Sequence, residues 1–162
     1  MAWDQIKLTS HLHVNKQPFV MVEKLEELHR LKTDGVCGLG FWKLDHDNPN
    51  IMLNLYQKGI IDFCVFSFYL SWDIDEHGEP LSEIILGGYD KKYMAEEKFH
   101  YTKIVDSRFW SIGLEGMKIN EKNFELVKYH NALIDSGSSL LHVPKIYFDI
   151  LLNQMVSAGI HL

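Results

Sequence analysis

Residues 132–141, Ala-Leu-Ile-Asp-Ser-Gly-Ser-Ser-Leu-Leu, place one carboxylate between an apolar strand and a turn of small residues. Burying Asp135 in such a setting is costly unless its oxygens accept hydrogen bonds. Gly137 offers an unobstructed N–H, and the neighbouring serines bring hydroxyls that both donate and accept. The same residues also fit an ordinary β-turn, because Asp, Ser and Gly are all good turn formers. The run therefore predicts a tight turn after a strand, with Asp135 held by its own neighbours.

The glycine spacing in residues 34–41, Asp-Gly-Val-Cys-Gly-Leu-Gly-Phe, is a second constraint on the fold. Glycines at every second or third position among apolar residues predict a strand that passes very close to other backbone. Gly38 and Gly40 do not make a phosphate-binding loop, because neither a third spaced glycine nor a Lys-Ser/Thr pair follows them. The stretch is therefore interpreted as a closely packed strand.

Length and composition allow a domain with a real core and exclude several classes. The 162 residues are 46% apolar and 12% aromatic, which predicts a folded chain. Lys and Arg are scattered under a net charge of −6, so no nucleic-acid partner is expected. The longest apolar run, residues 60–72, is interrupted by Asp62 and is too short to cross a membrane, and no signal peptide is visible. Cys37 and Cys64 lie in apolar runs and are expected to be buried free thiols.

Residue periodicity predicts mostly strands with a few short helices. The expected strands are residues 5–9, 18–22, 34–41, 64–70, 83–86, 99–105 and 110–119. Helices are expected at 22–32, after Asn48-Pro49 as far as Gly59, and after Pro144 as far as Gly159. The packing face of the last helix is expected to comprise Ile146, Ile150, Leu151 and Met155.

Metal sites and a serine nucleophile have little support. The nine histidines include no His-Glu-x-x-His sequence, and His11 and His13 are typical of exposed positions on one strand face. Residues 73–84 begin like a calcium loop, but the twelfth position holds Ile instead of a bidentate Glu, so a polar hairpin turn is expected. Ser138 or Ser139 as a nucleophile would need a general base that nothing in the sequence places nearby. No metal or other cofactor is expected.

Several stretches together resemble pepsin-like aspartic endopeptidases. The run around Asp135 is similar to the family's Asp-Thr/Ser-Gly-Thr/Ser signature in the second catalytic loop, including the following Ser-Leu-Leu and Pro144. Residues 34–40 are similar to the family's Asp-Gly-Ile-Leu-Gly-Leu-Gly. The family's order is kept between them by Phe-Ser-x-Tyr-Leu, Leu-Gly-Gly-x-Asp and Phe-Trp at residues 66–70, 86–90 and 109–110. The resemblance covers nearly all of the chain from about Asp34 onward, and extends more loosely from Asp4.

The resemblance implies peptide-bond hydrolysis by a water that an aspartate activates. Such enzymes use two carboxylates about 3 Å apart that share one proton. The ionised carboxylate acts as general base on the water, and its protonated partner polarises the scissile carbonyl. Because the two interact strongly, the pair titrates as a unit.

The resemblance also assigns a role to individual residues. Asp135 is implied to be the second catalytic carboxylate. The support of its loop would come from Ser136, Gly137 and Ser138: the first ties the two catalytic loops together, the second donates its N–H to the carboxylate, and the third bonds the outer carboxylate oxygen. Val36-Cys37-Gly38 would be the apolar-apolar-Gly step that threads beneath the first catalytic loop.

The implied fold is mainly β, a partial pepsin-like acid protease fold with parts of both lobes and a few short helices. Residues 1–92 would form the C-terminal half of the N-terminal lobe with the inter-lobe strands. Residues 93–162 would form the N-terminal half of the C-terminal lobe and carry the second catalytic loop. No second Asp-Ser/Thr-Gly occurs, since Asp34-Gly35 matches the threading step instead. We therefore expect an aspartic endopeptidase family member, acting on peptide or protein substrates, that is inactive as this isolated chain.

Two other functions remain open from the sequence. One is an enzyme completed by a complementing chain or by a second copy, with each copy contributing Asp135 across a two-fold axis. The other is a non-catalytic pseudo-protease or partner-binding module on the same scaffold. The sequence does not encode the compartment.

Overall fold

The computed structural model describes residues 1–24, 33–41, 48–79, 81–119, 122–125, 130–157 and 159. The chain divides into two compact units, residues 1–99 and residues 100–162. The division lies seven residues beyond the predicted boundary between residues 92 and 93. The assignment of these parts to two protease lobes stays a prediction.

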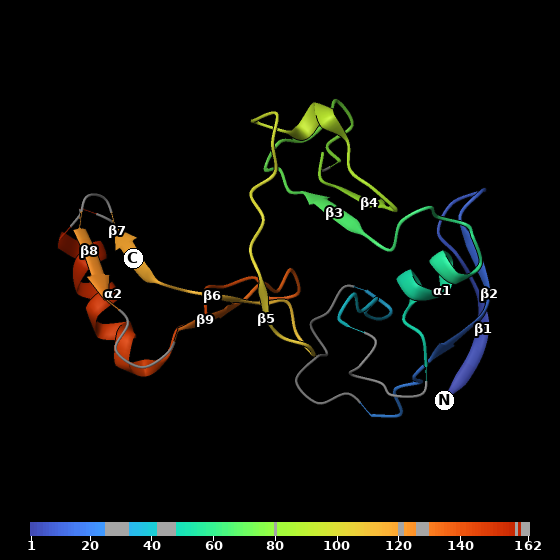
Figure 1. The fold of residues 1–162 in the computed structure, drawn as a ribbon, viewed down its shortest axis with the longest axis horizontal. Helices are drawn as coiled ribbons and strands as arrows, with labels where there is room; N and C mark the ends of the chain where they lie inside the picture. The colour runs from blue at the N-terminus through green and yellow to red at the C-terminus, as the bar shows by residue number, and fades with distance from the viewer. Residues whose placement is uncertain are drawn as a thin grey trace. The chain divides into compact units, whose positions relative to one another are not determined.

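The described residues form short strands with few helices, so the predicted mainly β class is confirmed (Figure 1). The first unit contains β1 (Ala2–Lys7), β2 (His13–Phe19), α1 (Ile51–Gln57), β3 (Phe66–Tyr69), β4 (Glu83–Leu86) and the 3-10 turn η2 (Lys91–Tyr93). The second unit contains β5 (Ile104–Asp106), β6 (Ser111–Gly113), β7 (Gly116–Ile119), β8 (Lys122–Glu125), β9 (Asn131–Leu133) and α2 (Lys145–Ser157).

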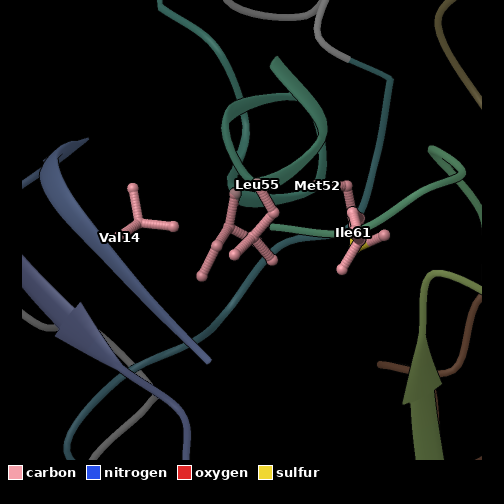
Figure 2. Packing of buried hydrophobic residues seen from close by; sticks show 5 residues of the cluster. Val14, Met52, Leu55 and Ile61 are labelled. Carbon is pink, nitrogen blue, oxygen red and sulfur yellow. The ribbon is translucent and has the colours of Figure 1, made fainter. Parts of the chain in front are cut away.

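A small apolar core in the first unit joins the β1–β2 hairpin to α1. Strands β1 and β2 pair antiparallel, with Ile6 opposite Val14. Figure 2 shows Val14 of β2 beside Met52 and Leu55 of α1, with Ile61 completing the cluster. All four of these core side chains are buried, and Leu55 is fully enclosed. This burial is what holds a helix of only seven residues in place, because so short a helix is not stable alone.

Two polar side chains within this core are joined by a hydrogen bond. The Asn54 amide nitrogen of α1 donates to the Gln17 side-chain oxygen of β2 over 3.0 Å. The Gln17 amide nitrogen donates to the Pro49 carbonyl, also over 3.0 Å. Both side chains are buried, so these bonds offset the cost of removing two amides from water. They also fix which face of α1 meets the hairpin.

The first-unit helix begins two residues later than predicted. Its N-cap is Asn50, whose side-chain oxygen accepts from the Leu53 N–H over 2.8 Å. Asn50 also keeps an extended backbone, so Pro49 lies before the cap and not at the first helical position. Gly59 ends the segment with φ +65, a left-handed conformation, which confirms its predicted role as a stop.

Strands β3 and β4 form the hairpin that the sequence predicted from strands at residues 64–70 and 83–86. Phe66 pairs opposite Leu86, and Tyr69 lies opposite Glu83. The intervening polar turn is held by Asp75, whose carboxylate accepts from the N–H groups of His77 and Glu79. These two bonds from backbone N–H groups to a single carboxylate explain the order of the turn.

Two segments of the first unit differ from their predictions. Residues 33–41 contain no strand, and nothing lies within 4 Å of the position that a Cβ would take on Gly35 or Gly38. The predicted close backbone approach is therefore absent among the described residues.

Cys37 and Cys64 are exposed, so the prediction of buried thiols is wrong. Cys37 lies in this irregular segment and Cys64 in the bend before β3. The helix predicted at 22–32 falls mostly outside the described residues.

The second unit contains a three-stranded antiparallel sheet in the order β5-β6-β9 and a separate β7–β8 hairpin. The strand predicted at 110–119 is therefore two strands, β6 and β7, which belong to different sheets.

Helix α2 follows Pro144 as predicted and is succeeded by Gly159 at φ +78. The predicted packing face is half right: Leu151 and Met155 are half-buried, but Ile146 and Ile150 are exposed and Tyr147 is the buried residue. The covered face of the helix therefore carries Tyr147 together with Leu151 and Met155, and the two isoleucines lie outside it.

Candidate catalytic loop

The Asp135 loop begins where the pairing of β9 with β6 ends. Within that ladder Leu133 lies opposite Ser111, and the Ile134 N–H donates to the Trp110 carbonyl over 2.9 Å. One residue later the chain reverses, with the Ser138 N–H donating to the Asp135 carbonyl over 3.2 Å. Strand β9, through its pairing with β6, thus positions Asp135 at the edge of the sheet.

Two groups of the same turn hold the Asp135 carboxylate. The Gly137 N–H donates to Oδ1 over 2.9 Å, and the Ser138 hydroxyl donates to Oδ2 over 2.7 Å. The turn predicted from the residues and the side-chain bonds predicted for Asp135 are both present. A side chain on Gly137 would crowd this arrangement, since its Cβ would lie 3.1 Å from Oδ1.

Hydrogen bonding, and not burial, controls the ionisation of Asp135. The Ser138 hydroxyl and then the Gly137 N–H hold the pKa of the carboxyl below its ordinary value of 3.8. Slight desolvation opposes them, and the nearby His142 adds a smaller lowering of the pKa. The Asp135 side chain is exposed, in contrast to the buried setting considered from the sequence. An exposed carboxylate with two donors stays ionised in mild acid and can accept a proton from water.

An open groove of about 710 Å³ lies beside this carboxylate. Its walls are mostly apolar and come from the β6–β7 connection, β7, β9, the loop and α2. The lining residues discussed below are Asp135, Ser138, Leu141, His142 and Tyr147. The groove gives an extended apolar ligand room to lie against the carboxylate.

The other predicted site residues are placed differently. Ser136 is exposed, and its hydroxyl makes no hydrogen bond within the described part of the chain. Val36, Cys37 and Gly38 lie in the first unit, where Val36 is 84% exposed. The structure brings Asp135, Gly137 and Ser138 together; the roles assigned to Ser136 and to the segment Val36-Cys37-Gly38 stay predictions.

His142 is a polar groove residue that was not predicted from the sequence. It follows Asp135 by seven residues and lines the same groove. A histidine close in sequence to a turn that reverses the chain was the available signal, but its spacing matches no metal or triad pattern.

A metal-ligand cluster and a membrane-spanning helix are both absent from the described ranges. These ranges hold no group of three or more His, Cys, Asp or Glu side chains arranged for a metal ion. Within them, no helix combines the length and apolar character that crossing a bilayer demands.

Similarity to known proteins extends over almost the whole chain. A family model described as eukaryotic aspartyl protease matches residues 1–160. Cathepsin D of Mus musculus is 31% identical over 70% of this chain and 27% of its own length. Plasmepsin VI of Plasmodium berghei is 29% identical over 82% of this chain and 32% of its own length. The pregnancy-associated glycoprotein of Equus caballus is 29% identical over 90% of this chain and 37% of its own length.

The chain thus spans about a third of the length of the relatives it matches. The matched residues include the glycine-containing turn, the hydrogen-bonded carboxylate and the groove beside it. Taken together, the local geometry and the extent of the match show that this chain belongs to the eukaryotic aspartyl protease family.

Proposed function

We propose that this chain supplies one of the two catalytic carboxylates, Asp135, of a pepsin-like aspartic endopeptidase. The observation that carries the proposal is the pair of short hydrogen bonds from Gly137 and Ser138 to the two oxygens of an aspartate at the mouth of an apolar groove. Substrates would be peptides or proteins, bound in extended form with apolar side chains in the groove.

The proposed chemistry needs a second carboxylate close to Asp135. Two such groups share one proton because like charges at about 3 Å cannot both be ionised. In the pair, the ionised member removes a proton from the attacking water, and the protonated member donates to the carbonyl oxygen of the scissile bond. Asp135 alone provides only half of this arrangement, so we propose that the isolated chain does not hydrolyse peptides.

A direct assay tests the proposed inactivity. The purified chain is incubated with a fluorogenic peptide that has bulky apolar residues on both sides of the scissile bond, over mildly acidic pH. We expect no turnover that is sensitive to pepstatin. Pepstatin-sensitive turnover that disappears in Asp135→Asn would overturn the proposed inactivity and would favour assembly of two copies.

A loop transplant tests the catalytic role itself. Residues 130–144 replace the corresponding loop of active Mus musculus cathepsin D, and the chimera is compared with versions carrying Asp135→Asn or His130→Gln. We expect the chimera and the His130→Gln version to cleave peptide, and the Asp135→Asn version to lose at least about a thousandfold in kcat, as losses of essential catalytic groups do. A folded chimera without activity would contradict the proposal and leave a non-catalytic module as the better account.

A further inference from the structure

We infer that Asp34 is a site of spontaneous modification, at which its carboxyl group reacts with the N–H of Gly35 and the residue isomerises to isoaspartate. The sequence contains a single Asp-Gly pair, and this pair lies in the described segment 33–41 of the first unit. The inference concerns the backbone of that segment and does not depend on the proposed proteolytic function.

The reaction uses only these two residues and water. The Gly35 nitrogen attacks Cγ of the protonated Asp34 carboxyl group, a bond between nitrogen and Cγ forms, and the carboxyl hydroxyl leaves with the amide proton as water. The product is a five-membered succinimide ring. Water then opens the ring: breaking the bond from nitrogen to Cγ restores aspartate, and breaking the bond from nitrogen to the main-chain carbonyl carbon gives isoaspartate. Nothing is oxidised or reduced, and the water lost in the first step is regained in the second.

Gly35 removes the steric obstacle that most residues present to this attack. Glycine has no Cβ beside its nitrogen, and its backbone turns easily into the conformations that ring closure requires. Nothing lies within 4 Å of the position that a Cβ would take on Gly35. The surroundings therefore leave room for the backbone to turn.

The segment around Asp34 offers little resistance to that movement. Residues 33–38 are exposed and contain neither helix nor strand. Within the described part of the chain, no hydrogen bond holds the Asp34 carboxylate or the Gly35 N–H. The side chain is therefore free to rotate until Cγ meets the adjoining nitrogen, which the covalent geometry already keeps within reach.

Two aspartates of the second unit are restrained where Asp34 is not. Asp106 and Asp135 precede serines, which are also small, yet each carboxylate accepts hydrogen bonds at both oxygens. Asp106 Oδ1 accepts from the Arg108 N–H over 2.8 Å, and Oδ2 accepts from the Arg108 guanidinium over 3.2 Å. The two Asp135 oxygens accept from Gly137 and Ser138. These bonds hold each carboxyl carbon in one orientation, so folding should protect both sites.

The test compares the folded and the unfolded chain. The full chain is incubated at neutral pH for several weeks, once in buffer and once in concentrated guanidinium chloride, and isoaspartate is located by electron-transfer mass spectrometry of its peptides. We expect nearly equal rates at Asp34 under the two conditions. Folding should slow the reaction at Asp106 and Asp135 at least about tenfold, because their hydrogen bonds must break before the attack.

Gly35→Ala is the matched variant. Gly35 is not among the glycines with positive φ, and the added Cβ enters open space, so the variant should fold as the wild type does. Isoaspartate at position 34 should nevertheless form at least about tenfold more slowly, since the methyl group hinders the attacking nitrogen and restricts the backbone. Methyl transfer from S-adenosylmethionine by an isoaspartate-specific carboxyl methyltransferase gives an independent measure of the product.

Either of two results would overturn the inference. One is a reaction at Asp34 that folding slows as much as it slows the reaction at Asp106, which would mean that the segment restrains its aspartate. The other is isoaspartate at Asp34 that forms equally fast in Gly35→Ala, which would exclude attack by that nitrogen. The measurement needs no enzymatic activity, so its failure leaves the proposed catalytic role of Asp135 untouched.

Discussion

The α1 region of the first unit and the Asp135 loop of the second differ in how far they bury a leucine side chain. Leu55 of α1 is 0% exposed, enclosed by the β1–β2 hairpin and the segment that follows the helix. Leu141 of the Asp135 loop is 82% exposed, although it lies only three residues beyond the turn at residues 135–138. The α1 region is held by packing, and the Asp135 loop is held by backbone pairing and by hydrogen bonds to one carboxylate.

The difference in burial between the two leucines follows from how many apolar side chains lie near each of them within its own unit. The α1 core draws on β2, α1 and Ile61, all within the first unit and fewer than fifty residues apart. In the second unit the large side chain that the described residues fully bury is Tyr147. A loop with so little packing keeps its shape through specific polar contacts, so substitutions there should alter ionisation more than stability.

The largest expected contrast is between the same change made at these two leucines. Leu55→Ala removes a fully enclosed side chain and should lower the free energy of unfolding of the first unit by about 3 kcal/mol. Leu141→Ala removes one that water already surrounds and should change stability by less than about 0.5 kcal/mol. Urea titration followed by amide resonances from each unit measures both. Equal losses at the two positions would show that the loop is packed in solution.

A second contrast uses glycines. Gly87 has φ +86, and a Cβ there would lie 2.9 Å from Cβ of the buried Ile61, so Gly87→Ala combines backbone strain with a clash in the core. We expect a loss of about 2 kcal/mol or more. Gly59→Ala is the control, because φ is +65 but nothing lies within 4 Å, and about 1 kcal/mol is expected.

Gly137→Ala extends the comparison to the second unit. Its added Cβ meets only the oxygen of an exposed carboxylate, which can move. In the same urea titration, the loss of unfolding free energy should be largest for Gly87→Ala, smaller for Gly59→Ala and smallest for Gly137→Ala. A loss at Gly137 as large as that at Gly87 would mean that the loop is as rigid as the core.

How far the sequence predicted these features depends on the range of the interactions involved. The β3–β4 hairpin, the stop at Gly59 and the bonds around Asp135 were predictable, because each depends on residues close together in the chain. The burial of single side chains was not predictable, as the exposed Cys37 and the exposed Ile146 and Ile150 of α2 show, because burial depends on which other segments cover a residue. The strand expected at 34–41 is absent for the same reason. Its glycines predict that another segment of backbone lies close by, and the described residues provide no such segment at Gly35 or Gly38.

The smallest expected effect on stability, and the sharpest on ionisation, comes from Ser138. Its hydroxyl is the main cause of the lowered pKa of Asp135, so Ser138→Ala should raise that pKa, while Ser138→Thr keeps the hydroxyl and should leave it near the wild-type value. Because the folded loop favours the ionised carboxylate, its contribution to stability is present above the carboxyl's ordinary pKa and is lost as the pH falls through the lowered folded value. The stability difference between wild type and Ser138→Ala should therefore be largest near neutral pH and shrink in acid, whereas the loss in Leu55→Ala should show no such dependence on Asp135. A Ser138→Ala difference that stays constant down to about pH 2, well below the ordinary carboxyl pKa, would mean that the hydroxyl supports the loop through some contact other than the carboxylate.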